Sequence, residues 1–144
     1  PKDLIWSSGV SGLDAIDVRV EGLGSLGTDN ALPLLHEIRH ALERLASTGE
    51  PTTIDLSSIP FSQHDRDRLF ETLGEGEVRA RVDAFGPSTV RETAFPGVWL
   101  VQHANPHDEE LSAFIEISRL PNILTTPLAD VEDSAVALAA KLAG

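Results

Sequence analysis

The 144-residue sequence contains no cysteine. This absence excludes disulfide bonds, thiolate metal sites, cysteine nucleophiles and any iron–sulfur cluster held by the chain's own thiols. Long apolar runs are also missing, since the longest, residues 135–140, is far shorter than the roughly 20 residues that a membrane-spanning helix needs. No basic segment followed by an apolar one opens the chain, as it would in a secretory signal. We therefore expect a cytoplasmic protein.

Basic residues are scarce, with 11 lysines and arginines against 23 aspartates and glutamates and a formal net charge of −12. Such a field repels phosphate backbones and anionic lipid headgroups, so we expect neither nucleic acid nor a membrane as a partner. The length fits one domain with a core of its own. We treat residues 1–144 as a single domain with an irregular arm over residues 1–12.

Three helices are predicted. Over residues 30–47, apolar side chains recur at helical spacing: Leu32, Leu35, Ile38, Leu42 and Leu45. Asn30 can cap the start of this helix, and Gly49 can end it. A second helix is expected over residues 62–73, where Ser62 and Asp65 have the spacing of a capping box. The third covers residues 130–142, with Val131, Ala135, Leu138 and Leu142 on one stripe.

Strands are predicted where apolar and polar residues alternate or where apolar runs lie between Gly and Pro turns. The alternation is strict over residues 77–85. The full set of predicted strands is 14–20, 52–56, 77–85, 89–94, 98–103 and 113–119, the fifth being apolar on both faces. The expected fold class is therefore α+β, with helices packed on one face of a mainly antiparallel sheet.

The segment His36-Glu37-Ile-Arg-His40 matches H-E-x-x-H, in which two histidines one helical turn apart bind zinc while the glutamate activates water. In the predicted helix both histidines lie nearly opposite the apolar stripe, so they should face solvent. A third protein ligand and the usual downstream histidine are also missing. A zinc-dependent hydrolase built on this motif is the alternative function, and we predict no metal site here.

The segment Gly22-Leu-Gly-Ser-Leu-Gly27 matches the dinucleotide fingerprint G-x-G-x-x-G between a predicted strand and a helix. The fingerprint requires the helix to begin within the glycines, whereas residues 28–33 postpone its start and place Asp29 near the phosphate position. Asp55, the candidate ribose ligand, also comes late. We therefore expect a loop here, and no cofactor.

Other combinations of reactive residues are incomplete. The loop His103-Ala-Asn-Pro-His107-Asp108 gathers possible metal ligands, but it supports adventitious binding at most. No serine lies in a G-x-S-x-G elbow. Because no catalytic constellation is complete, we predict that the protein is not an enzyme and has no catalytic residues.

One predicted sheet face has the composition of a binding surface. Arg79 and Arg81 share a face of their strand, Arg91 or Glu92 joins them if the next strand pairs with it, and Trp99 comes from the strand beyond. Arginine and tryptophan are enriched at interaction hot spots. The alternative is a solvated face of cross-strand ion pairs with a core tryptophan. These five residues are the candidate partner-binding set.

Two glycines bracket Glu75 where the second helix must stop and a strand must start. We predict that Gly74 or Gly76 needs a positive φ, which glycine adopts without strain.

Several stretches of the chain together resemble one protein family: residues 30–36, 54–56, 65–68, 73–82, 91–100 and 115–124. The densest are Leu73-Gly-Glu-Gly-Glu-Val-Arg-Ala-Arg-Val82 and Arg91-Glu-Thr-Ala-Phe-Pro-Gly-Val-Trp-Leu100. They are similar to the conserved domain of the HupH/HyaF-type hydrogenase expression proteins. The resemblance implies an accessory or chaperone-like protein that assists the cytoplasmic maturation of an uptake nickel–iron hydrogenase. The partner it implies is the small-subunit precursor of the enzyme or another hydrogenase maturation protein.

Overall fold

The structure, a computed structural model, describes residues 29–84 and 86–144. The predicted arm over residues 1–12, the predicted strand over 14–20 and the glycine segment over 22–27 lie outside the described residues. The elements are, in chain order, α1 (Ala31–Thr48), β1 (Thr52–Asp55), the 3-10 helix η2 (Leu56–Ser58), α2 (Gln63–Leu73), β2 (Arg79–Asp83), β3 (Pro87–Glu92), β4 (Val98–Ala104), β5 (Glu110–Ile117), the 3-10 helix η3 (Asn122–Leu124) and α3 (Leu128–Ala143).

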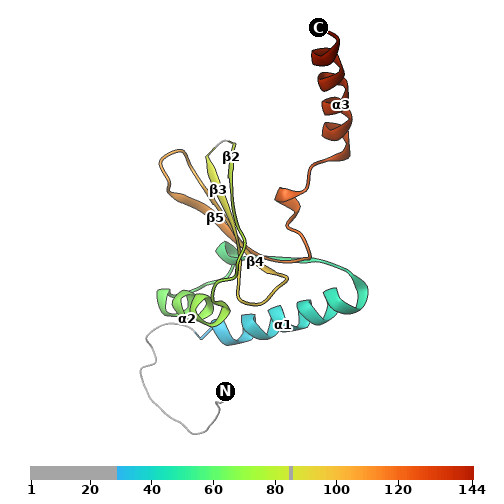
Figure 1. Ribbon diagram of the computed structural model, residues 1–144. Coiled ribbons are helices and arrows are strands. Elements are labelled where there is room, and N and C mark those ends of the chain that lie inside the picture. The colour runs from blue at the N-terminus through green and yellow to red at the C-terminus, as the bar shows by residue number, and fades with distance from the viewer. Residues whose placement is uncertain (1–28, 85) are drawn as a thin grey trace, which may run out of the picture.

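The five strands form one sheet in the order β1-β5-β4-β3-β2, and every neighbouring pair is antiparallel. Each predicted strand from residue 52 onward corresponds to an observed strand whose ends differ by a few residues. Helices α1 and α2 lie together on one side of the sheet (Figure 1). The predicted α+β class with a mainly antiparallel sheet is therefore confirmed.

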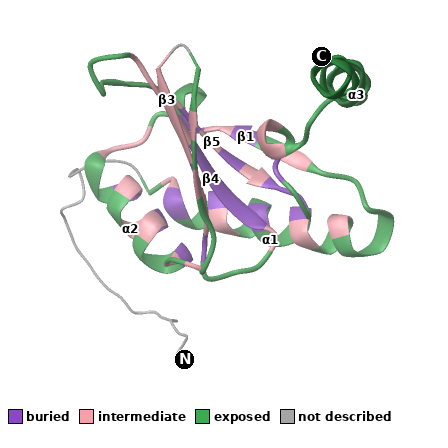
Figure 2. Cartoon of the chain, turned by 45° about the horizontal axis from the view of Figure 1, so that its top comes forward, coloured by how far each residue is buried: buried purple, intermediate pink, exposed green. Residues whose placement is uncertain are grey.

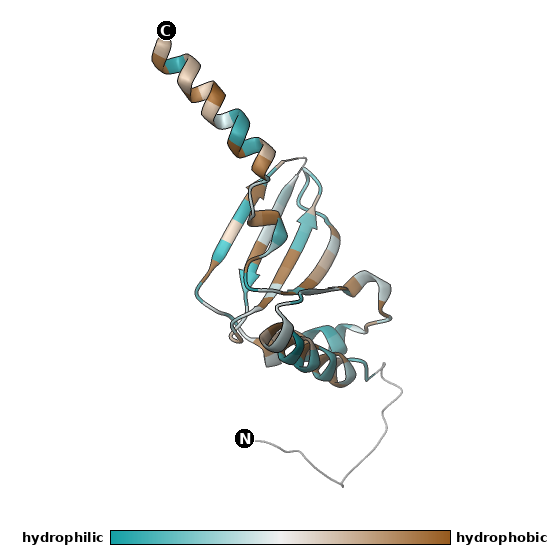
Figure 3. Cartoon of the chain, turned by 90° about the vertical axis from the view of Figure 1, so that its right-hand side faces the viewer, coloured by the Kyte–Doolittle hydropathy of each residue, from teal (hydrophilic) through white to brown (hydrophobic). Residues whose placement is uncertain are grey.

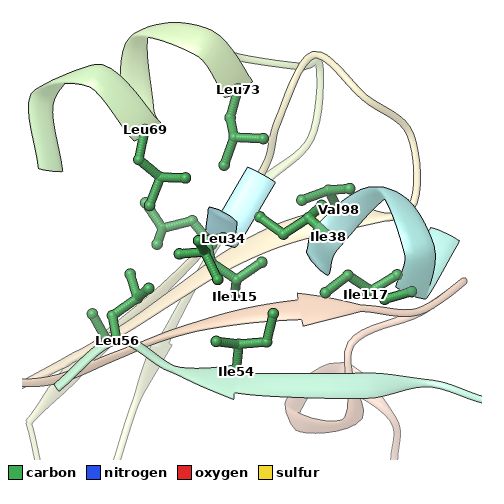
Figure 4. Packing of buried hydrophobic residues seen from close by; sticks show 12 residues of the cluster. Leu34, Ile38, Ile54, Leu56, Leu69, Leu73, Val98, Ile115 and Ile117 are labelled. Carbon is green, nitrogen blue, oxygen red and sulfur yellow. The ribbon is translucent and has the colours of Figure 1, made fainter. Parts of the chain in front are cut away.

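The main core lies between these two helices and the sheet (Figure 4). α1 contributes Leu34 and Ile38 to this core, and α2 contributes Leu69 and Leu73. These side chains pack against buried residues of η2 and the strands: Ile54, Leu56, Val98, Leu100, Ile115 and Ile117. Full burial of an aliphatic side chain contributes about 1.5–3 kcal/mol relative to exposure. This cluster is thus the main source of stability that the described residues provide.

The start of α1 differs from the prediction. Asn30 makes no side-chain cap, and its Nδ2 instead donates a hydrogen bond to the Pro60 carbonyl at 2.6 Å. Leu32, predicted to lie on the apolar stripe, is exposed. The buried row is Ala31, Leu34, Ile38 and Ala41. Because successive helical residues are about 100° apart, a row centred on Leu34 and Ile38 turns Leu32 toward solvent. The predicted end is confirmed, since Gly49 has φ +79° and donates its N–H to Leu45.

The capping box of α2 is confirmed. The Asp65 N–H donates to Ser62 Oγ at 3.1 Å, and the Ser62 N–H donates to Asp65 Oδ2 at 3.2 Å. Asp65 is also buried, and its Oδ1 accepts from the Asn30 N–H at 3.3 Å. One carboxylate therefore joins the starts of α1 and α2.

Helix α3 departs from the expected arrangement because it does not pack on the sheet. None of its residues is buried, and it projects away from the rest of the domain (Figures 1 and 3). Its apolar side chains are exposed, with Leu128 at 74% and Leu142 at 80%. No helix in the described part of the chain is long and apolar enough to cross a membrane.

The junction between α2 and β2 requires both predicted glycines, for different reasons. Gly74 has the positive φ, +65°, and its N–H donates to the Phe70 carbonyl at 2.9 Å. Gly76 donates its N–H to the Glu92 carbonyl at 2.8 Å, and a Cβ atom there would collide with the backbone oxygen of Thr93. The chain thus turns at Gly74 and lies close against the end of β3 at Gly76.

We predict that Gly74→Val lowers the free energy of unfolding by about 1–3 kcal/mol through backbone strain. Gly76→Ala should cost a similar amount, about 1–3 kcal/mol, because the added methyl group forces the backbone apart. Equilibrium urea unfolding measures both, and Glu77→Ala at an exposed neighbour is the matched control. A wild-type unfolding midpoint for either glycine variant would contradict this account of the junction.

Candidate functional site

The sheet extends beyond the helices at its β2–β3 end. The register places Arg79 opposite Arg91 and Arg91 opposite Leu100, so both arginines lie on the face that carries α1 and α2. Arg81 lies opposite Thr89 on the same face. On this face Arg79 and Arg81 are exposed and Thr89 and Arg91 are half-buried (Figure 2). We call Arg79, Arg81, Thr89 and Arg91 the arginine face.

Adjoining hollows run along this face. An open hollow of about 300 Å³ is lined by Arg79, Ala80, Arg81, Thr89 and Arg91. It shares Arg91 with a hollow of about 150 Å³ beside the end of α2, and it shares Arg81 and Thr89 with one of about 270 Å³ toward the β4–β5 loop. The arginine face is therefore an uneven surface that can receive a partner's side chains.

The three arginines form ion pairs with two carboxylates. Glu75 pairs with Arg79 and, at 3.7 Å, with Arg91 Nη1. Arg81 Nε donates to Asp83 Oδ1 at 2.9 Å. The Arg79 and Arg81 side chains are more than half exposed, at 63% and 61%, whereas Arg91 is at 30%. Exposed pairs of this kind contribute only about 0–1 kcal/mol, so a partner's carboxylate can replace them.

A polar cluster that sequence reasoning missed joins α2 to this end of the sheet. Glu110 accepts a hydrogen bond from Arg66 Nη2 at 2.8 Å and another from Gln102 Nε2 at 3.0 Å. The Arg66 guanidinium also lies 5.3 Å from the centre of the Phe70 ring. Arg66 is 44 positions from Glu110 and no motif links them, so the cluster depends on how α2 packs against the sheet.

Two members of the candidate set do not lie on the arginine face. Trp99 is opposite Glu92 in the register, which puts both on the other face of the sheet. Trp99 is only 5% exposed, packs with Val90 and Val101, and donates its indole N–H to the Ser118 carbonyl at 3.0 Å. The expectation that arginine and tryptophan share an uncovered face was wrong. Adjacent strand residues point to opposite faces, so a shift of one residue in the pairing of β3 with β4 would have placed Trp99 on the same face as Arg91.

The histidines predicted to face solvent do so. His36 and His40 are exposed on α1, and within residues 29–84 and 86–144 no three His, Asp or Glu side chains form a group that could hold a metal ion. His103 of β4 is hydrogen-bonded through its Nδ1 to Ser88 Oγ at 2.8 Å. The H-E-x-x-H and His103–Asp108 patterns thus gain no support from the geometry.

Comparison with known proteins identifies the fold and the family. A family model described as "HupH hydrogenase expression protein, C-terminal conserved region" matches residues 28–143. The chain belongs to this HupH C-terminal family. The match includes the arginine face, the α2–β2 junction and helix α3. The resemblance found in the sequence is therefore confirmed.

Relatives of this HupH-family chain carry consistent names. The hydrogenase expression/formation protein HoxQ of Azotobacter vinelandii is 36% identical over 123 residues, which cover 83% of this chain and 44% of the relative. The hydrogenase-1 operon protein HyaF of Escherichia coli K12 is 28% identical over 109 residues, covering 76% and 38%. A solved structure of the hydrogenase expression protein HupH from Thiobacillus denitrificans aligns with a TM-score of 0.78 at 44% identity and covers 81% of this chain and 98% of that one.

The HupH-family chain spans only part of its curated relatives, between 38% and 54% of their length in five matches. The shared region is thus one portion of those longer proteins.

The structure separates the candidate residues into two classes that stability measurements can distinguish. Trp99→Ala should lower the free energy of unfolding by about 3–5 kcal/mol, because it removes a large buried side chain. Arg79→Ala and Arg81→Ala should change it by no more than about 0.5 kcal/mol. Chemical denaturation of the three variants tests this difference, and a stable Trp99→Ala protein would show that the tryptophan is not a core residue.

Proposed function

We propose that the chain is a non-enzymatic accessory or chaperone-like protein in the maturation of an uptake nickel–iron hydrogenase. It binds the small-subunit precursor or another maturation protein, in the cytoplasm. The observation that carries this proposal is the family match over residues 28–143, together with relatives named as hydrogenase expression/formation proteins.

The arginine face supports the proposal as the surface for partner binding. Its guanidinium groups are accessible, arranged on neighbouring strands and bordered by hollows. Arginine forms charge-assisted, bidentate hydrogen bonds to carboxylates, which give both affinity and orientation. Trp99 belongs to the core, so it supports the sheet rather than the contact itself.

The hydrolase alternative gains no comparable support. His36 and His40 are exposed on a single helix without a third ligand in the described part of the chain. Zinc catalysis requires three protein ligands around an open position in an enclosed site. We therefore propose only the accessory function.

The binding role predicts a charge effect confined to one surface. The double variant Arg79→Glu/Arg81→Glu should fold normally and lose at least about tenfold in affinity for the small-subunit precursor, since two charge-assisted contacts become repulsive. The double variant Arg39→Glu/Arg44→Glu makes the same change in net charge on exposed α1 residues and should bind like the wild type. Pull-down of the precursor followed by titration provides the measurement. Equal affinity for both double variants would remove the arginine face from the proposal.

The non-enzymatic role predicts tolerance at the histidines. His36→Ala/His40→Ala should unfold within about 0.5 kcal/mol of the wild type, as exposed substitutions away from helix ends do. Hydrogenase maturation in a host that depends on this chain should also be unchanged. A stably folded double variant that fails to support maturation would contradict the proposal and revive a role for the motif.

A further inference from the structure

We propose that the free edge of β2 binds an extended segment of the client protein by strand addition, and that this segment carries acidic residues at alternate positions with a small or apolar residue between them. This inference rests on the proposed function, because it specifies how the arginine face recognises its client.

β2 is an edge strand of the sheet. In the order β1-β5-β4-β3-β2 it pairs with β3 alone, and no other strand among the described residues lies against it. An edge strand has a row of backbone N–H and C=O groups without partners, and another chain can pair with them. The edge belongs to the same strand that carries Arg79 and Arg81.

The backbone groups of alternate β2 residues point outward. Glu92 donates its N–H to the Val78 carbonyl at 2.9 Å, and Ala84 donates to the Gly86 carbonyl at 3.4 Å. The even-numbered positions therefore pair with β3, since antiparallel ladders alternate between hydrogen-bonded and non-bonded residues. It follows that Arg79, Arg81 and Asp83 present their N–H and C=O groups to the free edge.

The side chains along this edge determine the sequence of the bound strand. Residues that face each other across an antiparallel pair have Cβ atoms roughly 4.5–5.5 Å apart and share a face. Residues of the client opposite Arg79 and Arg81 thus point to the arginine face, where carboxylates would replace the weak pairs to Glu75 and Asp83. The client residue between them lies on the other face beside Ala80 and Val82, which favours a small or apolar side chain.

A second copy of the chain fits this edge less well. Two β2 edges paired antiparallel about Arg81 would match Arg79 with Asp83 at both ends but place the two Arg81 guanidinium groups opposite each other, and like charges directly opposite are destabilising. An apolar strand is disfavoured too, because charged side chains along an edge oppose unselective pairing. The charge complementarity is satisfied by an acidic segment.

Amide hydrogen exchange of the wild-type chain tests the edge directly. In the free protein, the Ala80 and Val82 amides should be protected, and the Arg79, Arg81 and Asp83 amides should exchange rapidly. Adding a short peptide in which Glu and Val alternate should slow exchange of those three amides at least tenfold. A peptide of the same composition with its glutamates contiguous should have little effect. If the Arg79, Arg81 and Asp83 amides exchange at the same rate with a large excess of the alternating peptide as without it, the inference is wrong.

A matched pair of variants isolates the backbone contribution. Asp83→Pro removes an outward N–H at an edge position where proline is tolerated, whereas Asp83→Ala keeps that N–H and releases Arg81. The proline variant should bind the alternating peptide about tenfold more weakly than the alanine variant, the effect expected of one backbone hydrogen bond. Equal affinity would contradict strand addition. The exchange measurement does not depend on either variant and remains decisive if Asp83→Pro fails to fold.

Two further outcomes separate this inference from the proposed function. If Arg79→Glu/Arg81→Glu abolishes precursor capture while Asp83→Pro and Asp83→Ala bind it equally, the accessory function stands and strand addition is wrong. If protection of the edge amides instead rises with the concentration of the chain alone, the occupant is a second copy and the inference is likewise wrong.

Discussion

Strand β4 determines the arrangement of the domain because it is buried on both faces. Val98 and Leu100 face α1 and α2, while Trp99 and Val101 face the opposite side. Apolar side chains on both faces require cover on both faces. The helices provide one cover. Ile123 and Leu124 of the short η3 segment provide part of the other, and Trp99 is held there by its bond to Ser118. On the face that carries the helices, the β2–β3 end keeps Arg79 and Arg81 exposed to solvent.

Local features of the fold could be predicted from the sequence because they depend on neighbouring residues. The alternation along β2, the Ser62–Asp65 capping box and the glycine end of α1 each follow from contacts within a few positions. The face of Trp99 could not be predicted in this way. It depends on how residues 93–97 set the register of β3 against β4, and a shift of one residue moves every side chain to the other face. The burial of Asp65 and the Glu110 cluster likewise depend on pairings between distant elements.

Helix α3 is a second case in which the sequence predicts an element but not its packing. Its pattern correctly indicated an amphipathic helix, yet the pattern does not specify what covers the apolar stripe. In the described part of the chain nothing does, since all of its residues are exposed. An isolated helix of about this length is marginally stable in water, and α3 has no buried residue that packing on the described fold could stabilise. The family match extends through this helix, which makes it a feature of the conserved region rather than a tail of this one chain.

The net charge of −12 bears on how an acidic client can bind an acidic protein. At physiological ionic strength the Debye length is about 8 Å, so most surface carboxylates are screened at the arginine face. There, Arg79, Arg81 and Arg91 outnumber the Glu75 and Asp83 carboxylates that pair with them. The remaining long-range repulsion slows the approach of acidic segments in general. A segment attracted only by charge therefore binds weakly. A segment that also forms backbone hydrogen bonds to the β2 edge is held in register with the arginines. Specificity then follows from the two requirements together: acidic residues at alternate positions, and an extended backbone free to pair.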